Sequence, residues 1–583
     1  MDFNVLELNV DRNLLKSNFD GYKLSLEPVA VLKNPLQVLP DRVLPSEDQY
    51  SYLHAELFSL QNHLYHDVWT NDTSYYFDEN WNMRRIHFNL REGRFAPIAA
   101  VFRLKRRNRV SGHYNASLIF ISEKYAIIGD GISSIEIIDT GDRVKGSEWK
   151  KIAEIKVLPD DKVGFILKDA RFEIIQEVKI FHCVLLRVEQ QEEGFDSVLE
   201  WISINLSDQT IKFRRELRSK SSIPYLSLTS NCSGIILASG KQIKFSYDSE
   251  KPVEEVQEER KISAYNWKQT DKTVEIMFHG QEDGEDDDFA VSCIDQRIVV
   301  KFKNNVLLEG ELFGPIDPQG IQLKLIAECV TVKQNTNSKQ SHLNLHRELK
   351  NYCAKIDKNI FTIILMKESE DGKWLHLIPD SPCELYNELS QEMTRDRREI
   401  STLTSQMEED CDREDNEADY FICRLDGESH KVTHKVNLGG FPPLFPVSLR
   451  PGQPAAIALR HDVDCLLWLP MQTRDEWNLR HDGTLDAFAY VLASKQQRKY
   501  VSCSPDLSYS VICEPERHVF IYKSTYKSAE GLRKRSGPQI TMGQQKVITL
   551  EDVGGQVIGM SVLNEITFLL TEKFILCLQI NVD

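Results

Sequence analysis

The sequence predicts an all-β protein in which a β-propeller of about seven or eight blades is interrupted by an inserted antiparallel β-sandwich. Two regions, residues 51–248 and 420–583, consist of short apolar strands separated by polar turns. A third region with its own strand pattern lies between them and is flanked by acidic segments. At about 40–45 residues a blade, the two outer regions together supply the predicted number of blades.

Residues 1–50 are expected to form an extended N-terminal segment that lies on the propeller. The segment contains several prolines and the run Phe19-Asp-Gly-Tyr-Lys-Leu. The first part of the propeller, residues 51–248, follows. Strands are expected at residues 117–122, 125–129 and 135–139, and the same pattern returns at 181–188, 199–204 and 234–239.

Residues 249–260 form an acidic linker, whose charge suits an exposed tether. Residues 381–419 form a second linker, which begins with helical spacing of Leu385, Leu389 and Met393 and ends in an acidic run. Between the two linkers, residues 261–380 form a separate domain.

The second part of the propeller is residues 420–583. Residues 456–468 predict two strands around a tight turn, and residues 500–522 predict three successive strands of one blade. A single propeller closed by both chain ends, with the inserted domain between two blades, leaves no long unpaired strand edge. Two independent β-sandwiches are the alternative.

The inserted domain opens with an aromatic and a Trp-x-Gln-Thr element, which here is Tyr265, Trp267, Gln269 and Thr270. Alternating strands follow at 273–279 and 297–302, then a hairpin around Gly310, a closing strand at 361–367, and Trp374. This order resembles the CS domain, the small β-sandwich of the NudC family and of co-chaperones of the ninety-kilodalton heat-shock protein. All four positions of the opening motif are present.

The resemblance is interrupted at about residues 320–358, where the family has a short strand that contains a Trp. This chain has a longer, polar insert without that Trp. Either residues 321–326 or residues 329–332 replace the strand, or the sandwich is locally incomplete, or the insert is a gene-model artefact.

The resemblance implies a non-catalytic co-chaperone or adaptor. Its CS domain would bind client proteins, foremost β-propeller proteins, in cooperation with the heat-shock chaperone. The alternative is a propeller-based scaffold in which the CS domain is only structural or regulatory. The candidate protein-binding residues are Tyr265, Trp267, Gln269, Thr270, Lys301, Gly310 and Trp374. The two tryptophans are expected in the core, whereas Gln269 and Lys301 are expected as exposed contacts.

Composition excludes several other classes of protein. The formal charge of −17 argues against direct nucleic-acid binding, which needs clustered Lys and Arg. No run of about 18 apolar residues is present, so membrane insertion is not expected. The first residues lack the pattern of a secretory signal.

The twelve cysteines are scattered without a CxxC pair, which predicts buried free thiols and a cytoplasmic protein. Basic clusters at 105–109 and 533–535 keep a nuclear location as an alternative.

No catalytic residue, metal ligand set or cofactor is predicted. Nucleophile and metalloprotease motifs are missing from the sequence. The acidic run 282–288 lacks the oxygen spacing of a calcium loop and is expected to be a solvated hairpin loop. The segment His461-Asp-Val-Asp464 suits a strand turn better than a metal site.

Overall fold

The computed structural model describes residues 3–581 with gaps, and it divides into two compact units. The longer gaps are 254–264, 280–288, 326–359, 379–419 and 525–539; the shorter ones are 17, 159–162, 192–193, 271, 295–296, 303–304, 315, 317–321, 368–373, 375–376 and 473–475. The first unit comprises residues 1–253 and 411–583, and the second comprises residues 254–410. Each unit is described by itself.

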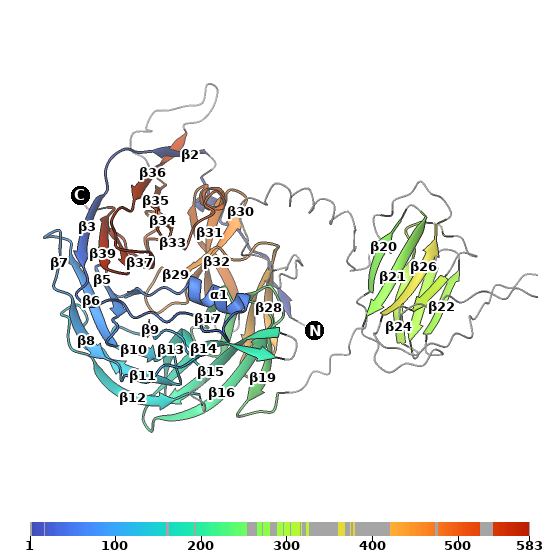
Figure 1. Ribbon diagram of the computed structural model, residues 1–583, viewed down its shortest axis with the longest axis horizontal. Coiled ribbons are helices and arrows are strands. Elements are labelled where there is room, and N and C mark those ends of the chain that lie inside the picture. The colour runs from blue at the N-terminus through green and yellow to red at the C-terminus, as the bar shows by residue number, and fades with distance from the viewer. Residues whose placement is uncertain are drawn as a thin grey trace, which may run out of the picture. The chain divides into compact units, whose positions relative to one another are not determined.

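The first unit is a β-propeller, and its described residues form seven sheets that follow one another around a ring (Figure 1). This confirms the predicted all-β fold.

We number the blades in chain order. Blade 1 contains β4 (Tyr65–His66), β5 (Thr73–Phe77), β6 (Asn82–Asn89), β7 (Arg94–Phe95) and β8 (Ala99–Arg103). Blade 2 contains β9 (Ser117–Phe120), β10 (Tyr125–Gly129), β11 (Ser134–Asp139) and β12 (Lys150–Lys156). Blade 3 contains β13 (Ile166–Ile175), β14 (Val178–Gln191), β15 (Gly194–Asn205), β16 (Thr210–Ser219) and β19 (Lys244–Asp248).

The remaining blades combine strands from distant parts of the chain. Blade 4 contains β17 (Tyr225–Leu228), β18 (Gly234–Ser239), β27 (Tyr420–Asp426), β28 (Val432–Gly439) and β1 (Asn4–Val5). Blade 5 contains β29 (Phe445–Val447), β30 (Ala456–His461), β31 (Asp464–Gln472) and β32 (Trp477–Leu485). Blade 6 contains β33 (Tyr500–Cys503), β34 (Ser510–Cys513), β35 (His518–Lys523), β36 (Thr541–Thr549) and β2 (Phe19–Leu24). Blade 7 contains β37 (Val557–Val562), β38 (Ile566–Thr571), β39 (Phe574–Gln579) and β3 (Ala30–Pro35). The helical elements among the described residues are η1 (Arg12–Leu14), α1 (Tyr52–Ser59) and α3 (Phe488–Ala493).

Apolar side chains between neighbouring blades hold the ring together. Each of the seven junctions has its own buried cluster, including the one that joins blade 7 to blade 1 through Phe568, Leu570, Ile86 and Phe88. Central strands are therefore covered on both faces, and all six residues of β18 are buried. The strands predicted at 500–522 are β33, β34 and β35 of one sheet, which confirms that prediction.

The second unit contains the CS-like residues 261–380 and is called the CS unit below. It is inserted within a blade, which corrects the expectation that it lies between two blades. Strand β18 precedes the insertion and β27 follows it, yet the two pair directly from Gly234–Asp426 to Ser239–Phe421. Between them, β19 joins the preceding blade as a fifth strand beside β16. Because β18 and β27 are far apart in the sequence, the pattern of each strand by itself does not predict that they pair.

The N-terminal segment contributes one edge strand to each of three blades. Strand β1 pairs with β28, β2 pairs with β36, and β3 completes the last blade beside β39. Over blade 5, the Asp11 N–H donates to His481 Nδ1 at 3.2 Å, and the Lys16 ammonium is 2.9 Å from the buried Asp486 carboxylate. The segment thus ties blades 4 to 7 together from outside.

The predicted turn at His461–Asp464 is confirmed. Strand β30 ends at His461, β31 begins at Asp464, and these two residues pair. Asp462 has φ of +52°, a conformation that Asp tolerates better than most residues.

The CS unit is a sandwich of two antiparallel sheets. One sheet has the order β20 (Tyr265–Gln269), β21 (Thr273–His279), β26 (Ile360–Met366) and β25 (Gln322–Leu325). The other contains β22 (Phe289–Ile294), β23 (Arg297–Phe302) and β24 (Asn305–Glu311). Of the alternatives for the interrupted strand, the first is observed, because Leu323 of β25 pairs with Ile363 of β26. The rest of the predicted insert lies largely outside the described residues, as do the expected helix at 384–400 and the acidic run 282–288.

Two separately produced pieces, residues 1–253 and 411–583, are expected to assemble into one propeller. Blade 4 is completed only when β18 meets β27, and blades 6 and 7 need β2 and β3 from the first piece. Co-expression followed by purification through a tag on one piece should recover both. A first piece that starts at residue 36 serves as the matched control and should give a less heat-stable complex. Two soluble pieces that do not associate would contradict the topology.

Arg143→Met should lower the free energy of unfolding by about 3–5 kcal/mol, because it leaves the carboxylate of Asp67 buried without its cation. Arg143 is 2% exposed, its Nε is 2.7 Å from Asp67 Oδ2, and Asp67 is fully buried. Arg94→Met is the control, because Arg94 is 74% exposed in its pair with Glu92 and should change stability by less than about 1 kcal/mol. Urea unfolding of both variants measures the difference, and equal effects would refute the assignment.

Candidate functional site

The two tryptophans of the CS motif lie in the core of the sandwich, as expected. Trp267 is 1% exposed and Trp374 is 5% exposed. Both belong to one buried cluster that includes Ile276, Ile298 and Ile363 from the two sheets. Their main contribution is apolar burial, so neither indole is available to contact another protein.

Gln269 is expected as an exposed contact, but in the structure it is half-buried and hydrogen-bonded to Trp374 and Lys367. We call this set of hydrogen bonds the latch. Its side-chain Nε2 donates to the Trp374 carbonyl at 2.7 Å, and its Oε1 accepts from the Trp374 N–H at 2.8 Å. The Lys367 ammonium donates to the same Oε1 at 2.8 Å. Both ends of the amide therefore fix the chain at the end of the domain against its first strand.

Gly310 leaves space for the closing segment. A Cβ on Gly310 would lie 2.5 Å from Ile378 Cγ2, and a Cβ on Gly314 would lie 2.6 Å from Trp374 Nε1. The Phe313 N–H donates to the Leu377 carbonyl at 3.0 Å. Glycine is required at both positions by the close approach of Ile378 and Trp374.

The remaining candidates lie at the surface or in the backbone ladder. Thr270 is exposed, and its Oγ1 accepts from the Thr273 N–H at 2.9 Å, which orders the β20–β21 turn. Tyr265 pairs through its backbone with Phe278, and its side chain lies outside the described residues. Lys301 is exposed on β23 opposite Val306. Of the seven candidates, Trp267 and Trp374 thus lie in the core, and Gln269 and Gly310 are half-buried against the closing segment.

The outer face of β22–β24 is the exposed surface around Lys301. Arg297, Val299 and Lys301 alternate along β23, and Val299 lies opposite Glu309. Arg297 pairs with Glu309 at 2.8 Å, and Val306 is 48% exposed. Sequence reasoning selected only Lys301 here, although the alternation of the strand would also have indicated Val299 and Arg297. This face therefore presents two valines, Val299 and Val306, among charged side chains.

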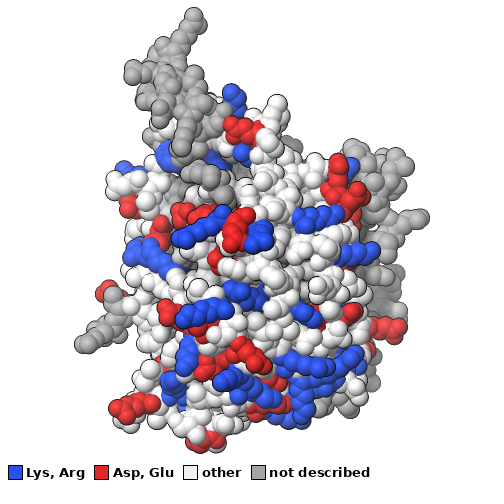
Figure 2. Space-filling view, turned by 90° about the vertical axis from the view of Figure 1, so that its left-hand side faces the viewer, with Lys and Arg blue, Asp and Glu red and all other residues white. Residues whose placement is uncertain are grey.

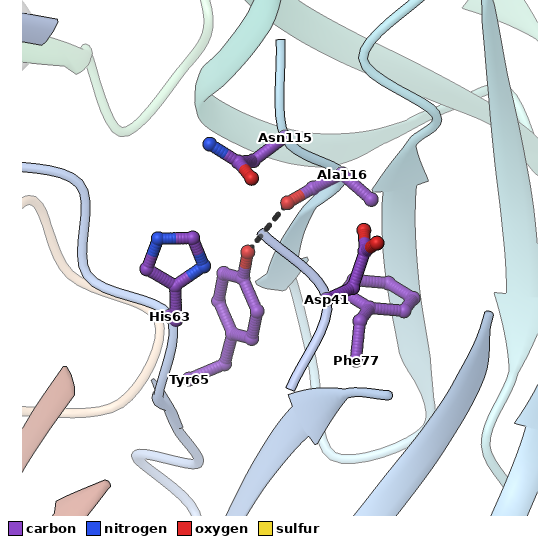
Figure 3. A pocket seen from close by; sticks show the side chains of 6 residues that line it. All are labelled: Asp41, His63, Tyr65, Phe77, Asn115 and Ala116. Carbon is purple, nitrogen blue, oxygen red and sulfur yellow. Dashed lines mark hydrogen bonds between the residues drawn. The ribbon is translucent and has the colours of Figure 1, made fainter. Parts of the chain in front are cut away.

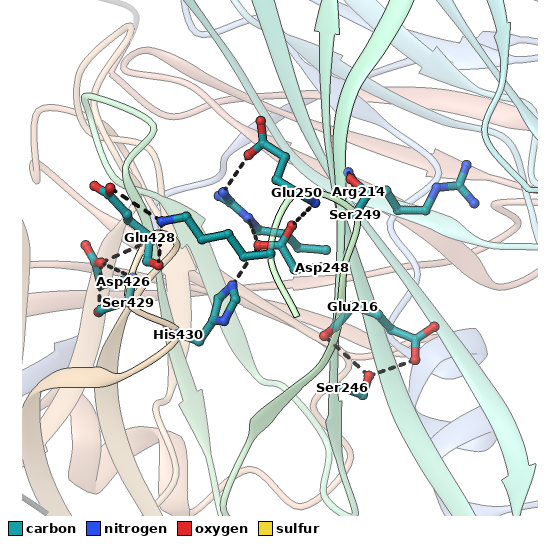
Figure 4. Close-up of polar contacts among 12 residues, drawn as sticks. Arg214, Glu216, Ser246, Asp248, Ser249, Glu250, Asp426, Glu428, Ser429 and His430 are labelled. Atoms are coloured by element: carbon teal, nitrogen blue, oxygen red, sulfur yellow. Dashed lines mark hydrogen bonds and ion pairs between the residues drawn. The ribbon is translucent and has the colours of Figure 1, made fainter. Parts of the chain in front are cut away.

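A polar clamp fixes the chain where it leaves the propeller for the CS unit (Figure 4). The Asp248 carboxylate accepts from Arg215 Nε at 2.8 Å and from the Glu250 N–H at 2.8 Å, and it lies 2.6 Å from His430 Nε2. Burial would raise the pKa of Asp248, but the hydrogen bonds from Glu250, His430 and Arg215 outweigh it and hold the pKa below its ordinary value. The clamp joins the strand before the insertion to the β27–β28 turn after it.

The small pocket beside blade 1 is a packed polar site without room for a substrate (Figure 3). It is lined by Asp41, His63, Tyr65, Phe77, Asn115 and Ala116, and its interior does not admit a water molecule. The Tyr65 hydroxyl donates to the Ala116 carbonyl at 2.6 Å. Burial, with the charges of Arg42 and Lys499, lowers the pKa of His63 to about 3, so the ring is neutral at pH 7.

Other chemistry-bearing side chains have structural roles. Among the described residues, no three His, Cys, Asp or Glu side chains gather as metal ligands would. The described cysteines are free and buried, and burial raises the pKa of Cys232 to about 12. In the basic cluster 105–109, Arg107 pairs with Glu154 at 2.8 Å and Arg109 with Asp41. The cluster at 533–535 lies outside the described residues.

Charges on the side of the molecule shown in Figure 2 are mixed. Lys and Arg side chains alternate with Asp and Glu over this face, without a continuous basic area. Within the part of the chain that the structure describes, no helix has the length and apolar character that crossing a membrane requires.

The sequence is similar to a known domain family and to known full-length proteins. The model of the CS domain family matches residues 263–335. The chain is 28% identical to NudC domain-containing protein 1 of Mus musculus over 605 residues, which cover 99% of each chain. It is also 28% identical to NudC domain-containing protein 1 of Xenopus tropicalis over 608 residues, which cover 98% of each. The chain therefore contains a CS domain and resembles these proteins from end to end, which confirms the predicted resemblance to the NudC family.

Two solved structures also show likeness to parts of the chain. A nuclear movement protein from E. cuniculi GB-M1 is 14% identical, covers 20% of this chain and 99% of its own, and has a TM-score of 0.13. The WD40 domain of SCAP from fission yeast is 8% identical, covers 97% of this chain and 99% of its own, and has a TM-score of 0.30.

Gln269→Leu should destabilise the CS unit by about 1–3 kcal/mol, because it leaves the N–H and carbonyl of Trp374 without their partners. Amide hydrogen exchange of β21 and β26 reports on this unit separately from the propeller and should become faster. Lys301→Ala is the matched control and should leave exchange unchanged. If Gln269→Leu exchanges like the unmodified chain, the latch has no energetic role.

Proposed function

We propose that this chain is a non-catalytic co-chaperone or adaptor whose CS domain binds client proteins, foremost β-propeller proteins, together with the heat-shock chaperone machinery. The observation that supports it most is the composition of the CS sandwich. Trp267, Gln269 and Trp374 are used within the domain, so its exposed sheet faces remain for recognition. The end-to-end resemblance to NudC domain-containing protein 1 supports the same class of function.

The outer face of β22–β24 is the client surface that we favour. It presents Lys301, Val299 and Val306 on rigid strands, and its charged pair Arg297–Glu309 lies at the edge of the apolar centre. Such a surface can hold apolar segments of an incompletely folded protein while the charges limit association with itself. No nucleotide or cofactor enters this account. A cytoplasmic location, with the nucleus as the alternative, belongs to the same proposal.

A scaffold function is the second candidate. It is favoured by the direct β18–β27 pairing, because the propeller completes blade 4 without any strand from the CS unit. In that case the partners would bind the propeller, and the CS unit would be structural or regulatory.

Val306→Asp combined with Lys301→Glu should weaken client binding about tenfold or more, because it places acidic groups in an apolar contact. The measurement is the ability of the full chain to suppress aggregation of a purified, heat-destabilised β-propeller protein. Lys145→Glu, a change at a residue 82% exposed on the propeller, is the matched control and should retain activity.

The same assay separates the two candidates. If a chain that lacks residues 254–410 suppresses aggregation as well as the full chain does, the client site is not in the CS unit and the scaffold function is favoured.

A further inference from the structure

The segment before blade 1 crosses the end of the propeller. The Leu36 N–H bonds to the Lys573 carbonyl of blade 7, and the chain returns where the His63 N–H donates to the Ile558 carbonyl of the same blade. Between these points, α1 reaches the opposite side of the ring (Figure 1). The His54 and Phe195 rings are 5.4 Å apart, and Leu57 packs on the cluster between blades 3 and 4. Helix α1 therefore lies against blades 3 and 4, while the chain on either side of it is bonded to blade 7.

The outer face of α1 carries no charge. Its sequence, Tyr52-Leu-His-Ala-Glu-Leu-Phe-Ser59, contains one acid. Glu56 is turned inward: its Oε2 is buried, and its carboxylate lies beside Ser222 and Lys168. Burial also lowers the pKa of His54 to about 4, so this ring is neutral. The one acidic side chain of α1 therefore faces inward, and the outer face is uncharged.

Large apolar side chains remain exposed on this outer face. Tyr52 is 60% exposed, and Leu60, two helical turns further on, is 54% exposed. Tyr50 is 68% exposed and packs edge-on against Phe195 with the ring centroids 5.1 Å apart. We call the surface formed by Tyr50, Tyr52 and Leu60 the mouth surface.

The chain segment that carries the mouth surface is acidic. Residues 43–66 contain Glu47, Asp48 and Glu56 but no Lys or Arg. Glu47 and Asp48 are exposed immediately before Tyr50, and Asp196 follows Phe195. Tyrosine faces and carboxylates both attract Lys and Arg side chains.

We propose that the mouth surface is a docking site for a cationic segment of a partner protein in which Arg or Lys alternates with apolar residues. The apolar side chains cover Tyr52 and Leu60, and the cationic ones reach Tyr50, Glu47 and Asp48. This site belongs to the propeller and does not depend on the CS unit being the client site.

The test uses a short fluorescent peptide of alternating Arg and Leu, with Glu/Leu and Arg/Ser peptides of the same length for comparison. Anisotropy titrations use the full chain. The Arg/Leu peptide should bind most tightly, and its affinity should fall as salt is raised. Tyr52→Ser combined with Leu60→Ser should weaken it about tenfold or more, and Glu47→Gln combined with Asp48→Asn should weaken it several-fold.

Leu26→Ser is the control, because Leu26 is 91% exposed in the N-terminal segment, and it should bind like the unmodified chain. Thermal unfolding must be unchanged in all variants, as expected for surface positions. Equal binding by the Tyr52/Leu60 variant, or equal binding of the Glu/Leu peptide, would overturn the proposal. A concentration-dependent dimer that this variant abolishes in sedimentation would also overturn it, since a second copy would then cover the surface.

A chain that lacks residues 254–410 should bind the Arg/Leu peptide as the full chain does. Loss of client binding in that chain with retained peptide binding distinguishes the mouth surface from the CS site. Failure of one proposal therefore leaves the other testable.

Discussion

The pairing of β18 with β27 is the constraint on which the rest of the structure depends. It joins residues on either side of the CS insertion into one sheet, from Gly234–Asp426 to Ser239–Phe421. Without it, blade 4 would divide into the two-stranded piece β17–β18 and the three-stranded piece β27–β28–β1, and an isolated two-stranded hairpin is marginal by itself. With it, the insertion costs little, because the entropy of closing a loop grows only slowly with its length.

Closure of the ring follows from the same arrangement. The N-terminal segment adds β1 to blade 4, β2 to blade 6 and β3 to blade 7. Blades 4, 6 and 7 therefore contain strands from both halves of the chain, and blade 4 also contains the β18–β27 pairing. The clamp of Asp248 with Arg215 and His430 then fixes the last strand before the insertion to the first turn after it. The CS unit has a separate core, with Trp267 and Trp374 at its centre.

Local pattern predicted much of the fold. Alternation and turn residues indicated the strands of the propeller, and the order Tyr265, Trp267, Gln269, Thr270 indicated the CS domain. Register across long separations was not predictable in this way. Nothing within residues 234–248 shows that β18 pairs with a strand that follows the insertion. Nor does this segment show that β19 joins the preceding blade. For the same reason, Gln269 looked like a surface amide, because its partner Trp374 lies 105 residues away. Local pattern also did not reveal that Glu56 faces inward and leaves the outer face of α1 uncharged, or that α1 lies at the end of the ring.

We propose two tasks for this chain: the CS unit would recognise clients through sheet faces that its own core leaves free, and the propeller would bind a cationic partner segment at the mouth surface. Amide hydrogen exchange of the intact chain, with and without a bound β-propeller client, tests the first task most directly. We expect slower exchange in β23 and β24 on client binding, with the strands of blades 1 to 7 unchanged. Slower exchange confined to the propeller, with β23 and β24 unaffected, would contradict the central claim.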